Sequence, residues 1–252
     1  MNTARLMQHT EQGATNNLLM FPGCQQEQPA GNAGKTDSMY KSNGQIKATA
    51  AEPIEEMSDV HKMLDLFLEK DQYRNYLILS LGINFALRAS DLLKLTIEDI
   101  FNKDGSVKQY FEIYEKKTKK YNKVAIPDAM RAVLDKYFEA LPDPVFTTDP
   151  LFISREKDHY GRKKPLTIRQ INNILKKAAK ECGLSEHVSS HSMRKTYGYQ
   201  MMKANDFSQD VLYALQYTFN HSDIRTTFRY TGLEQKKANE LRNQMGEMLF
   251  NG

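Results

Sequence analysis

The chain has 252 residues and a net charge of +4, and 40% of its residues are hydrophobic, which is enough for a core and too much for a wholly disordered chain. No apolar run reaches the roughly 18–20 residues of a membrane span, and Leu18–Phe21 is too short for a signal peptide. Cys24 and Cys182 offer neither a disulfide framework nor a metal-ligand spacing. The composition therefore predicts a cytoplasmic protein with no membrane partner, no metal and no cofactor.

Residues 1–54 differ in composition from the rest of the chain. They contain eleven Asn or Gln residues, four basic side chains and four acidic ones, and they lack a clear apolar periodicity. Such a segment buries too little apolar surface to offset the entropy lost on ordering. We predict a disordered or linker-like segment over 1–54 and a folded domain over 55–252, which holds the whole excess of positive charge.

The first half of this domain is predicted to combine helices with a small sheet. Apolar residues recur at helical spacing after Ser58, which is a suitable N-cap. Two later strand-like runs enclose a cluster of lysines, which predicts a β-hairpin with a basic tip. The predicted helices cover 58–68, 72–87, 91–95 and 128–140, and the predicted strands cover 110–114, 123–126 and 151–153.

The second half has only helical patterns. Apolar residues from Ile168 to Ala178 share one face of a helix that Gly183 ends. The fold class predicted for the whole domain is mainly α with a small antiparallel β-sheet (α+β). The remaining helices are predicted over 190–204, 209–216 and 223–229, with a last one from Glu234.

Two short basic runs concentrate the positive charge. They cover 116–120 in the predicted hairpin and 162–164 after the third strand. Basic runs attract polyanions such as nucleic acids, although for either run alone a solvated surface is the better interpretation. Together they predict DNA-binding residues at Lys116, Lys119, Lys120, Arg162, Lys163 and Lys164.

Four local patterns carry residues suited to chemistry. Taken alone, each pattern has a simpler explanation. The first would be an arginine paired with Asp91, the second a solvated turn, the third two unrelated surface residues and the fourth a surface aromatic. His191 and Arg194 have the i, i+3 spacing that places both side chains on one helix face. The four patterns contain, in chain order, Arg88; Lys117; His191 with Arg194; and His221 nine residues before Tyr230.

In this order the patterns resemble the tyrosine recombinase (phage integrase) family. That family carries an Arg, a hairpin Lys, a His-x-x-Arg motif, a His or Trp, and a Tyr nucleophile. The resemblance covers about residues 57–245 and implies that family's catalytic-domain fold. It also implies site-specific recombination through DNA strand cleavage and rejoining, as in the integration of mobile elements. The catalytic residues it implies are Arg88, Lys117, His191, Arg194, His221 and Tyr230.

These residue types suit attack on a phosphodiester. Two arginines, Arg88 and Arg194, can clamp the non-bridging oxygens bidentately, and His221 can add a hydrogen bond. A Tyr hydroxyl has a pKa near 10 and needs activation; we expect neighbouring cations to lower that pKa and His191 to accept the proton. Lys117 suits protonation of the leaving 5′-oxygen. The product is a 3′-phosphotyrosyl bond, and rejoining needs no ATP.

The sequence departs from the family at several positions. Asn220 stands where Gly is common, and Asp91 stands where Glu is common. We expect Asp91 to be the carboxylate that supports the two arginines, Arg88 and Arg194. The hairpin is about two residues longer than usual, which makes Lys119 a rival to Lys117. Residues 1–54 are too short and polar to form the core-binding domain of many members. We expect either an excised or shortened form or a naturally single-domain member.

The resemblance also implies partners. We expect double-stranded DNA and self-association on DNA as a tetramer, in which the C-terminal helix docks into a neighbouring protomer. The sparse apolar positions of the last helix, Leu233 to Leu249, fit that docking and ordinary packing equally well. Three rival functions stay open: relaxation of DNA as by a type IB topoisomerase, a non-catalytic DNA-binding module, and a helical transcription regulator.

Overall fold

The computed structural model describes residues 6–7, 51–115, 117, 119–141, 144–185 and 187–250. The predicted linker over 1–54 therefore lies mostly outside the described residues. Of its residues, Leu6–Met7 form the short strand β1, which pairs in parallel with β4 (Val145–Phe146). The predicted boundary at residue 55 stays a prediction.

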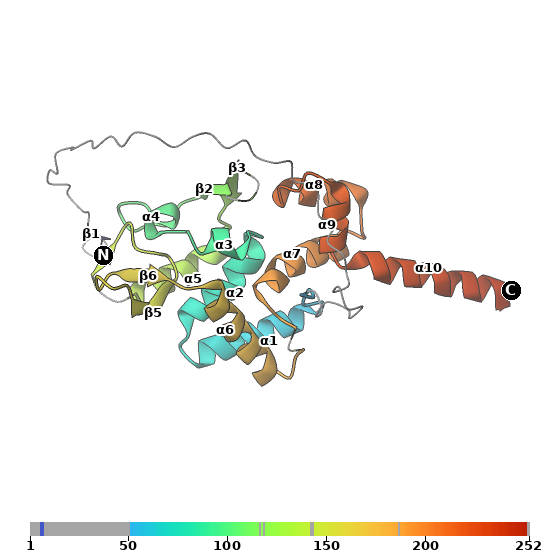
Figure 1. Cartoon of the computed structure of the whole chain (residues 1–252), viewed down its shortest axis with the longest axis horizontal. Coiled ribbons are helices and arrows are strands. Elements are labelled where there is room, and N and C mark those ends of the chain that lie inside the picture. The colour runs from blue at the N-terminus through green and yellow to red at the C-terminus, as the bar shows by residue number, and fades with distance from the viewer. Residues whose placement is uncertain are drawn as a thin grey trace, which may run out of the picture. The chain divides into compact units, whose positions relative to one another are not determined.

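The described chain is mainly helical, as predicted (Figure 1). Two antiparallel hairpins, β2–β3 and β5–β6, stand beside the helices, where only the first of them was expected. The helices are α1 Met57–Glu69, α2 Tyr73–Asn84, α3 Ala89–Leu92, α4 Ile97–Ile100, α5 Asp128–Glu139, α6 Ile168–Glu181, α7 Ser190–Ala204, α8 Gln209–Thr218, α9 Ile224–Tyr230 and α10 Leu233–Phe250. The remaining strands are β2 Tyr110–Glu115, β3 Lys120–Ala125, β5 Ile153–Lys157 and β6 Lys163–Pro165.

Two apolar clusters hold these elements. The larger cluster contains the buried faces of α1, α2, α5 and α6, and its members include Phe67, Leu79 and Leu175. The smaller cluster contains Tyr199, Phe219 and residues of α8, with Tyr230 packed at its edge. Helix α7 packs against α2, α6, α8 and α9, so it joins the two clusters.

Close approach of helices around α7 depends on two glycines. A Cβ at Gly82 in α2 would lie 2.4 Å from the sulfur of Met193, closer than non-bonded atoms approach. A Cβ at Gly198 in α7 would lie 3.1 Å from the ring of Phe219. The two glycines therefore let α2 and the end of α8 approach α7, which carries His191 and Arg194.

Residues just before α1 form hydrogen bonds with α7. The backbone N–H of Ile54 donates to the Thr196 hydroxyl at 2.8 Å, and the Tyr199 hydroxyl donates to Glu55 at 3.1 Å. Ile54 is itself a buried member of the larger apolar cluster. The ordered structure that surrounds α7 thus includes residues just ahead of the first helix.

Candidate active site

Arg194 is the most deeply buried charged residue among the six predicted ones. Its side chain is 1% exposed. Its Nη1 donates to the carbonyl of Ala86 and its Nη2 to the carbonyl of Phe219, each at 2.6 Å. Its Nε is buried and has no hydrogen-bond partner in the described part of the chain. The guanidinium is therefore fixed by two backbone carbonyls, and its buried Nε–H is left without a partner among the described residues.

Both carbonyls come from the C-terminal ends of helices. Ala86 follows α2, Phe219 is the C-cap of α8, and each end turns through a left-handed residue, Ala86 itself (φ 50°) and Asn220 (φ 50°). Helix C-termini carry partial negative charge on their unpaired carbonyls. Two such ends directed at Arg194 offset the cost of burying its charge, which the Phe219 ring, 4.6 Å away, also lowers.

Arg88 lies at the N-cap of α3 and forms an ion pair with Glu115, the last residue of β2. The Arg88 side chain is 14% exposed and that of Glu115 is fully buried. Asp91, the carboxylate expected to support the two arginines, also pairs with Lys94 at 2.9 Å. The negative charge of Asp91 raises the pKa of Arg194, which agrees with that expectation, and support of Arg88 by Asp91 stays a prediction.

The Tyr230 hydroxyl lies beside a candidate base. Its oxygen is 3.1 Å from Nε2 of His191. The Tyr230 ring contacts His221, with ring centres 5.0 Å apart, and the guanidinium carbon of Arg194 lies 5.7 Å from the ring centre. Four of the six predicted residues, drawn from α7, α9 and the loop before α9, therefore meet at one place.

Burial and repulsion between like charges shift the pKa values of the residues in this cluster. Burial, with repulsion from Arg88, lowers the pKa of Arg194 to about 10, so Arg194 stays charged at neutral pH. Burial, with repulsion from Arg194, lowers the pKa of His191 and lowers that of His221 to about 4. Both imidazoles are consequently neutral near pH 7.

Burial opposes the effect of the neighbouring cations on the pKa of Tyr230. The charges of Arg194 and Arg88 do lower it, as expected. Burial outweighs them, so the net pKa of the Tyr230 hydroxyl is raised above its usual value near 10. The hydroxyl is thus protonated in the resting site, and its proton needs an acceptor such as His191.

The tip of the β2–β3 hairpin adds a cation to the site. The charge of Lys117 lowers the pKa of both His191 and His221. Lys119 and Lys120 are exposed, and the Lys119 backbone N–H donates to the Glu115 carbonyl at 2.9 Å. Lys116 lies outside the described residues.

All three residues of the second basic run, 162–164, form ion pairs with carboxylates. Arg162 pairs with Asp158 at 2.7 Å. Lys163 and Lys164 pair at 2.8 Å with Asp149 and Glu156, respectively. Lys163 is also only 18% exposed. A DNA-binding role for this run stays a prediction, with less free charge than the sequence suggests.

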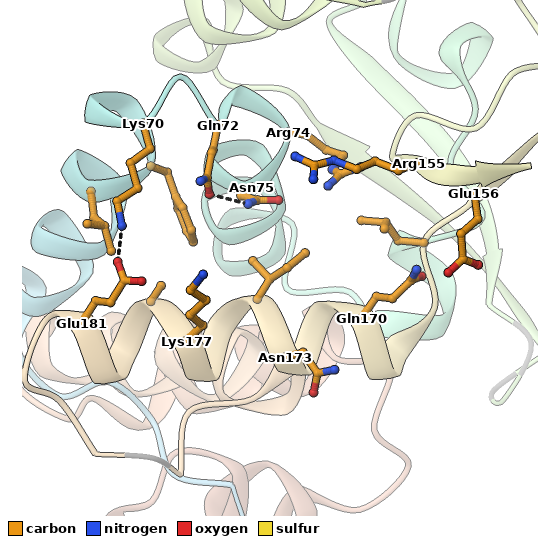
Figure 2. Close-up of a pocket in the computed structure, with 15 residues that line it drawn as sticks. Lys70, Gln72, Arg74, Asn75, Arg155, Glu156, Gln170, Asn173, Lys177 and Glu181 are labelled. Carbon is orange, nitrogen blue, oxygen red and sulfur yellow. Dashed lines mark hydrogen bonds and ion pairs between the residues drawn. The ribbon is translucent and has the colours of Figure 1, made fainter.

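A separate pocket of about 450 Å³ lies among α1, α2, β5 and α6 (Figure 2). Arg74 and Arg155 lie at one end, and an ion pair between Lys70 and Glu181 lies at the other. None of the six predicted residues lines it. The candidate active site is instead the polar cluster around Tyr230.

Glu115 was not among the residues predicted from the sequence. The strand β2 has a strictly alternating burial pattern in which Phe111, Ile113 and Glu115 face inward. This period of two was readable in the sequence and places a carboxylate on the apolar face. Such a placement indicates a buried ion pair.

Residues 53–237 match the phage integrase family. The chain belongs to this family. The probable integrase/recombinase YoeC of Bacillus subtilis is 31% identical over 185 residues, which are 73% of this chain and 91% of the relative. Tyrosine recombinase XerC of Thermodesulfovibrio yellowstonii is 27% identical over 67% of this chain and 53% of that protein. The chain therefore spans about half the length of that larger relative.

Solved structures give the same family fold. The XerA recombinase structure has a TM-score of 0.56 at 17% identity and is matched over 78% of this chain and 66% of that one. The XerH recombinase in a pre-cleavage complex with its difH substrate has a TM-score of 0.53, over 81% of this chain and 59% of that one. The predicted recombinase catalytic-domain fold is confirmed. No described helix is long and apolar enough to cross a membrane.

Proposed function

We propose that this phage integrase family member performs site-specific DNA recombination with Tyr230 as the nucleophile. The observation that carries the proposal is the 3.1 Å contact between the Tyr230 hydroxyl and Nε2 of His191. This pair lies beside a buried guanidinium that is charged at neutral pH, that of Arg194. A nucleophile, a base and a cation in one place are the parts that attack on a phosphodiester requires.

The two arginines form the proposed phosphate clamp. Arg194 has an Nε donor without a partner among the described residues, and the Arg88 side chain is 14% exposed. The charge of Arg88 lowers the pKa of Arg194, so the two cations lie close enough to repel. A phosphate between them relieves this repulsion and stabilises the charge that develops on its non-bridging oxygens.

Proton transfer follows from the neighbouring groups. The Tyr230 oxygen forms a bond to phosphorus while its proton passes to His191, whose lowered pKa keeps it neutral and able to accept. The bond from phosphorus to the 5′-oxygen breaks, and that oxygen takes a proton from Lys117. Electrostatic coupling of Lys117 to both histidines supports its assignment over Lys119.

His221 is proposed to donate to the same phosphate. Its Nδ1 lies 3.0 Å from the buried Thr227 hydroxyl. When that hydroxyl donates to Nδ1, the imidazole proton resides on Nε2, which is the donor that a phosphate oxygen needs. Thr227 therefore sets the tautomer of His221 in this mechanism.

A covalent capture experiment tests the proposal. The protein is incubated with a library of nicked duplexes that carry a randomised central segment, and adducts that survive denaturation are isolated. The recovered sequence defines a substrate, called here the selected duplex. Tyr230→Phe should form no adduct but bind the selected duplex as wild type does, because only the hydroxyl is removed. An adduct with Tyr230→Phe would show that another residue is the nucleophile. A second assay, strand exchange between two duplexes, separates recombination from topoisomerase-like relaxation.

The C-terminal helix supports assembly on DNA as a tetramer. Helix α10 extends away from the other helices (Figure 1). Leu241, Met245 and Met248 recur at helical spacing and are 55%, 53% and 68% exposed. Docking of this stripe on a neighbouring protomer would bury it. Replacement of Leu241 and Met245 by Ser should then lower the mass of the protein–DNA complex in sedimentation, and an unchanged mass would exclude this docking.

A further inference from the structure

Glu115 is a buried carboxylate that, among the described residues, bonds to Arg88, Asn122 and Asn220 in the candidate site. One oxygen, Oε2, forms the ion pair with Arg88. The other, Oε1, accepts from the side-chain amides of Asn122 at 3.1 Å and Asn220 at 2.7 Å. Its side chain has no exposed surface, and a charge is retained in such a place only when it is well paired. The carboxylate thus binds neighbours through both oxygens.

Asn220 links this carboxylate to the rest of the site. It adopts the left-handed conformation, with φ of 50°, which Gly and Asn adopt most readily. It lies between Phe219, whose carbonyl holds Arg194, and His221. An asparagine here satisfies the same backbone turn that a glycine would and adds an amide that reaches Glu115.

The two contacts join three segments far apart in the sequence. Glu115 ends the strand that leads into the Lys117 loop, Arg88 begins α3, and Asn220 precedes α9. In the sequence, Glu115 is 27 residues from Arg88 and 105 residues from Asn220. No local rule brings these segments together, so their relative position depends on such long-range contacts.

We propose, on the basis of the function proposed above, that Glu115 is a positioning residue of the phosphate clamp. Through one oxygen it fixes Arg88, and through the other it fixes the turn at Asn220 that places the Phe219 carbonyl and His221. The clamp is thereby assembled before DNA arrives. Glu115 itself touches no reacting atom.

Charge balance gives the physical reason. Arg88 and Arg194 repel each other in the resting site, and separation of the two cations would lose the clamp geometry. The Glu115 carboxylate counters this repulsion, and its charge favours the protonated forms of Arg194 and His221. The carboxylate is buried and bonds Arg88 through Nη1, whereas the Arg88 side chain keeps 14% of its surface exposed, from which it can reach a phosphate. Preorganised charges of this kind need little rearrangement during reaction.

The test is Glu115→Gln, with Glu112→Gln as the matched control. Glu112 lies on the same strand and faces solvent, so its replacement changes the net charge equally. Single-turnover cleavage of the selected duplex at saturating protein should fall about 10- to 100-fold in Glu115→Gln, the expected loss for a charged hydrogen bond. The dissociation constant for DNA should change less than about threefold. Glu112→Gln should match wild type in both measurements.

A neutral substrate separates positioning from general damage. In a methylphosphonate at the scissile position a methyl group replaces one non-bridging oxygen, so less charge requires the clamp. The difference between Glu115→Gln and wild type should shrink on this substrate. A difference of equal size on both substrates, or wild-type cleavage by Glu115→Gln, overturns the proposal.

Asn220→Gly gives a second route if Glu115→Gln does not fold. Glycine keeps the left-handed turn and removes only the amide. Cleavage should slow by about 3- to 10-fold, because the buried carboxylate loses one of its hydrogen-bond donors. Where both variants fold, the effects of the two changes should not add, because both act through one carboxylate. Full additivity overturns the coupling. Failure of wild type to form an adduct would instead remove the proposed function, and this inference with it.

Discussion

Arg194→Lys is the sharpest perturbation of this site, because one residue serves both stability and the proposed clamp. Lysine keeps the positive charge. It replaces the planar guanidinium, whose N–H groups have a fixed arrangement, by a single ammonium group that cannot reproduce that arrangement. Arg194 spans the Ala86 and Phe219 carbonyls at 2.6 Å each. A lysine presents all its donors from one nitrogen, so we expect at least one of these buried carbonyls to lose its partner.

The expected magnitudes follow from these contacts. One unsatisfied buried carbonyl costs about 1–3 kcal/mol, and the lost contact with the Phe219 ring adds about 0.5–1 kcal/mol. The free energy of unfolding should therefore fall by roughly 2–4 kcal/mol, out of the 5–15 kcal/mol typical of such domains. Cleavage should fall by about 10²–10³-fold, the usual loss when a donor to transition-state charge is removed.

Urea unfolding and single-turnover cleavage of the selected duplex measure the two effects. Arg88→Lys is the informative comparison, because Arg88 is partly exposed and a lysine can keep the ion pair with Glu115. We expect a similar loss of cleavage with little loss of stability. Arg155→Lys, outside the candidate site, should change neither. Wild-type cleavage by Arg194→Lys would refute the clamp, and greater destabilisation by Arg88→Lys would refute the anchoring argument.

Three further predictions concern the acid, the histidines and the basic runs. Lys117→Ala should lose cleavage on normal DNA and regain it on a substrate whose leaving oxygen is sulfur, a better leaving group; rescue of Lys119→Ala alone would move the acid two residues along. The folded pKa of His221, about 4, lies below its unfolded value near 6.5, so stability should fall as the pH drops from about 6.5 towards 4. His221→Asn should flatten this dependence in urea unfolding, and an unchanged slope would contradict the assigned shift. Replacing Lys119 and Lys120 by Ala should reduce the salt dependence of DNA binding by up to about 0.9 per residue in log–log slope, whereas replacing Lys163 and Lys164 should reduce it less, because both are ion-paired.

Helices with clear polar caps were predictable from sequence. The predicted helix over 190–204 coincides with α7, whose N-cap Ser189 forms a capping box. Thr167 likewise begins α6 through a capping box with Gln170. Helix α4 was missed because four residues are too few to show a period. The strand expected over 151–153 begins only at its last residue, because Leu151 and Phe152 are buried in a bend rather than in a ladder.

The site was only partly predictable, because part of it depends on local spacing and part on packing between distant segments. The spacing of His191 to Arg194 and of His221 to Tyr230 is local, so the sequence contains it. The groups that hold Arg194 are backbone carbonyls at the ends of α2 and α8, and any residue supplies a carbonyl. The raised pKa of Tyr230 arises from burial, which depends on packing between distant segments and has no signature in the residue itself.

Burial of this cluster has a consequence for the timing of the proposed reaction. In the resting site the pKa of Tyr230 is raised and that of His191 is lowered, so transfer of the proton from Tyr230 to His191 is unfavourable. A phosphate held by Arg88 and Arg194 favours the charged form of a nearby imidazole and raises its pKa. The base therefore strengthens when the phosphate is present, and bonding of the Tyr230 oxygen to phosphorus removes the need for a free phenolate. A site built in this way holds its nucleophile inert until DNA is bound.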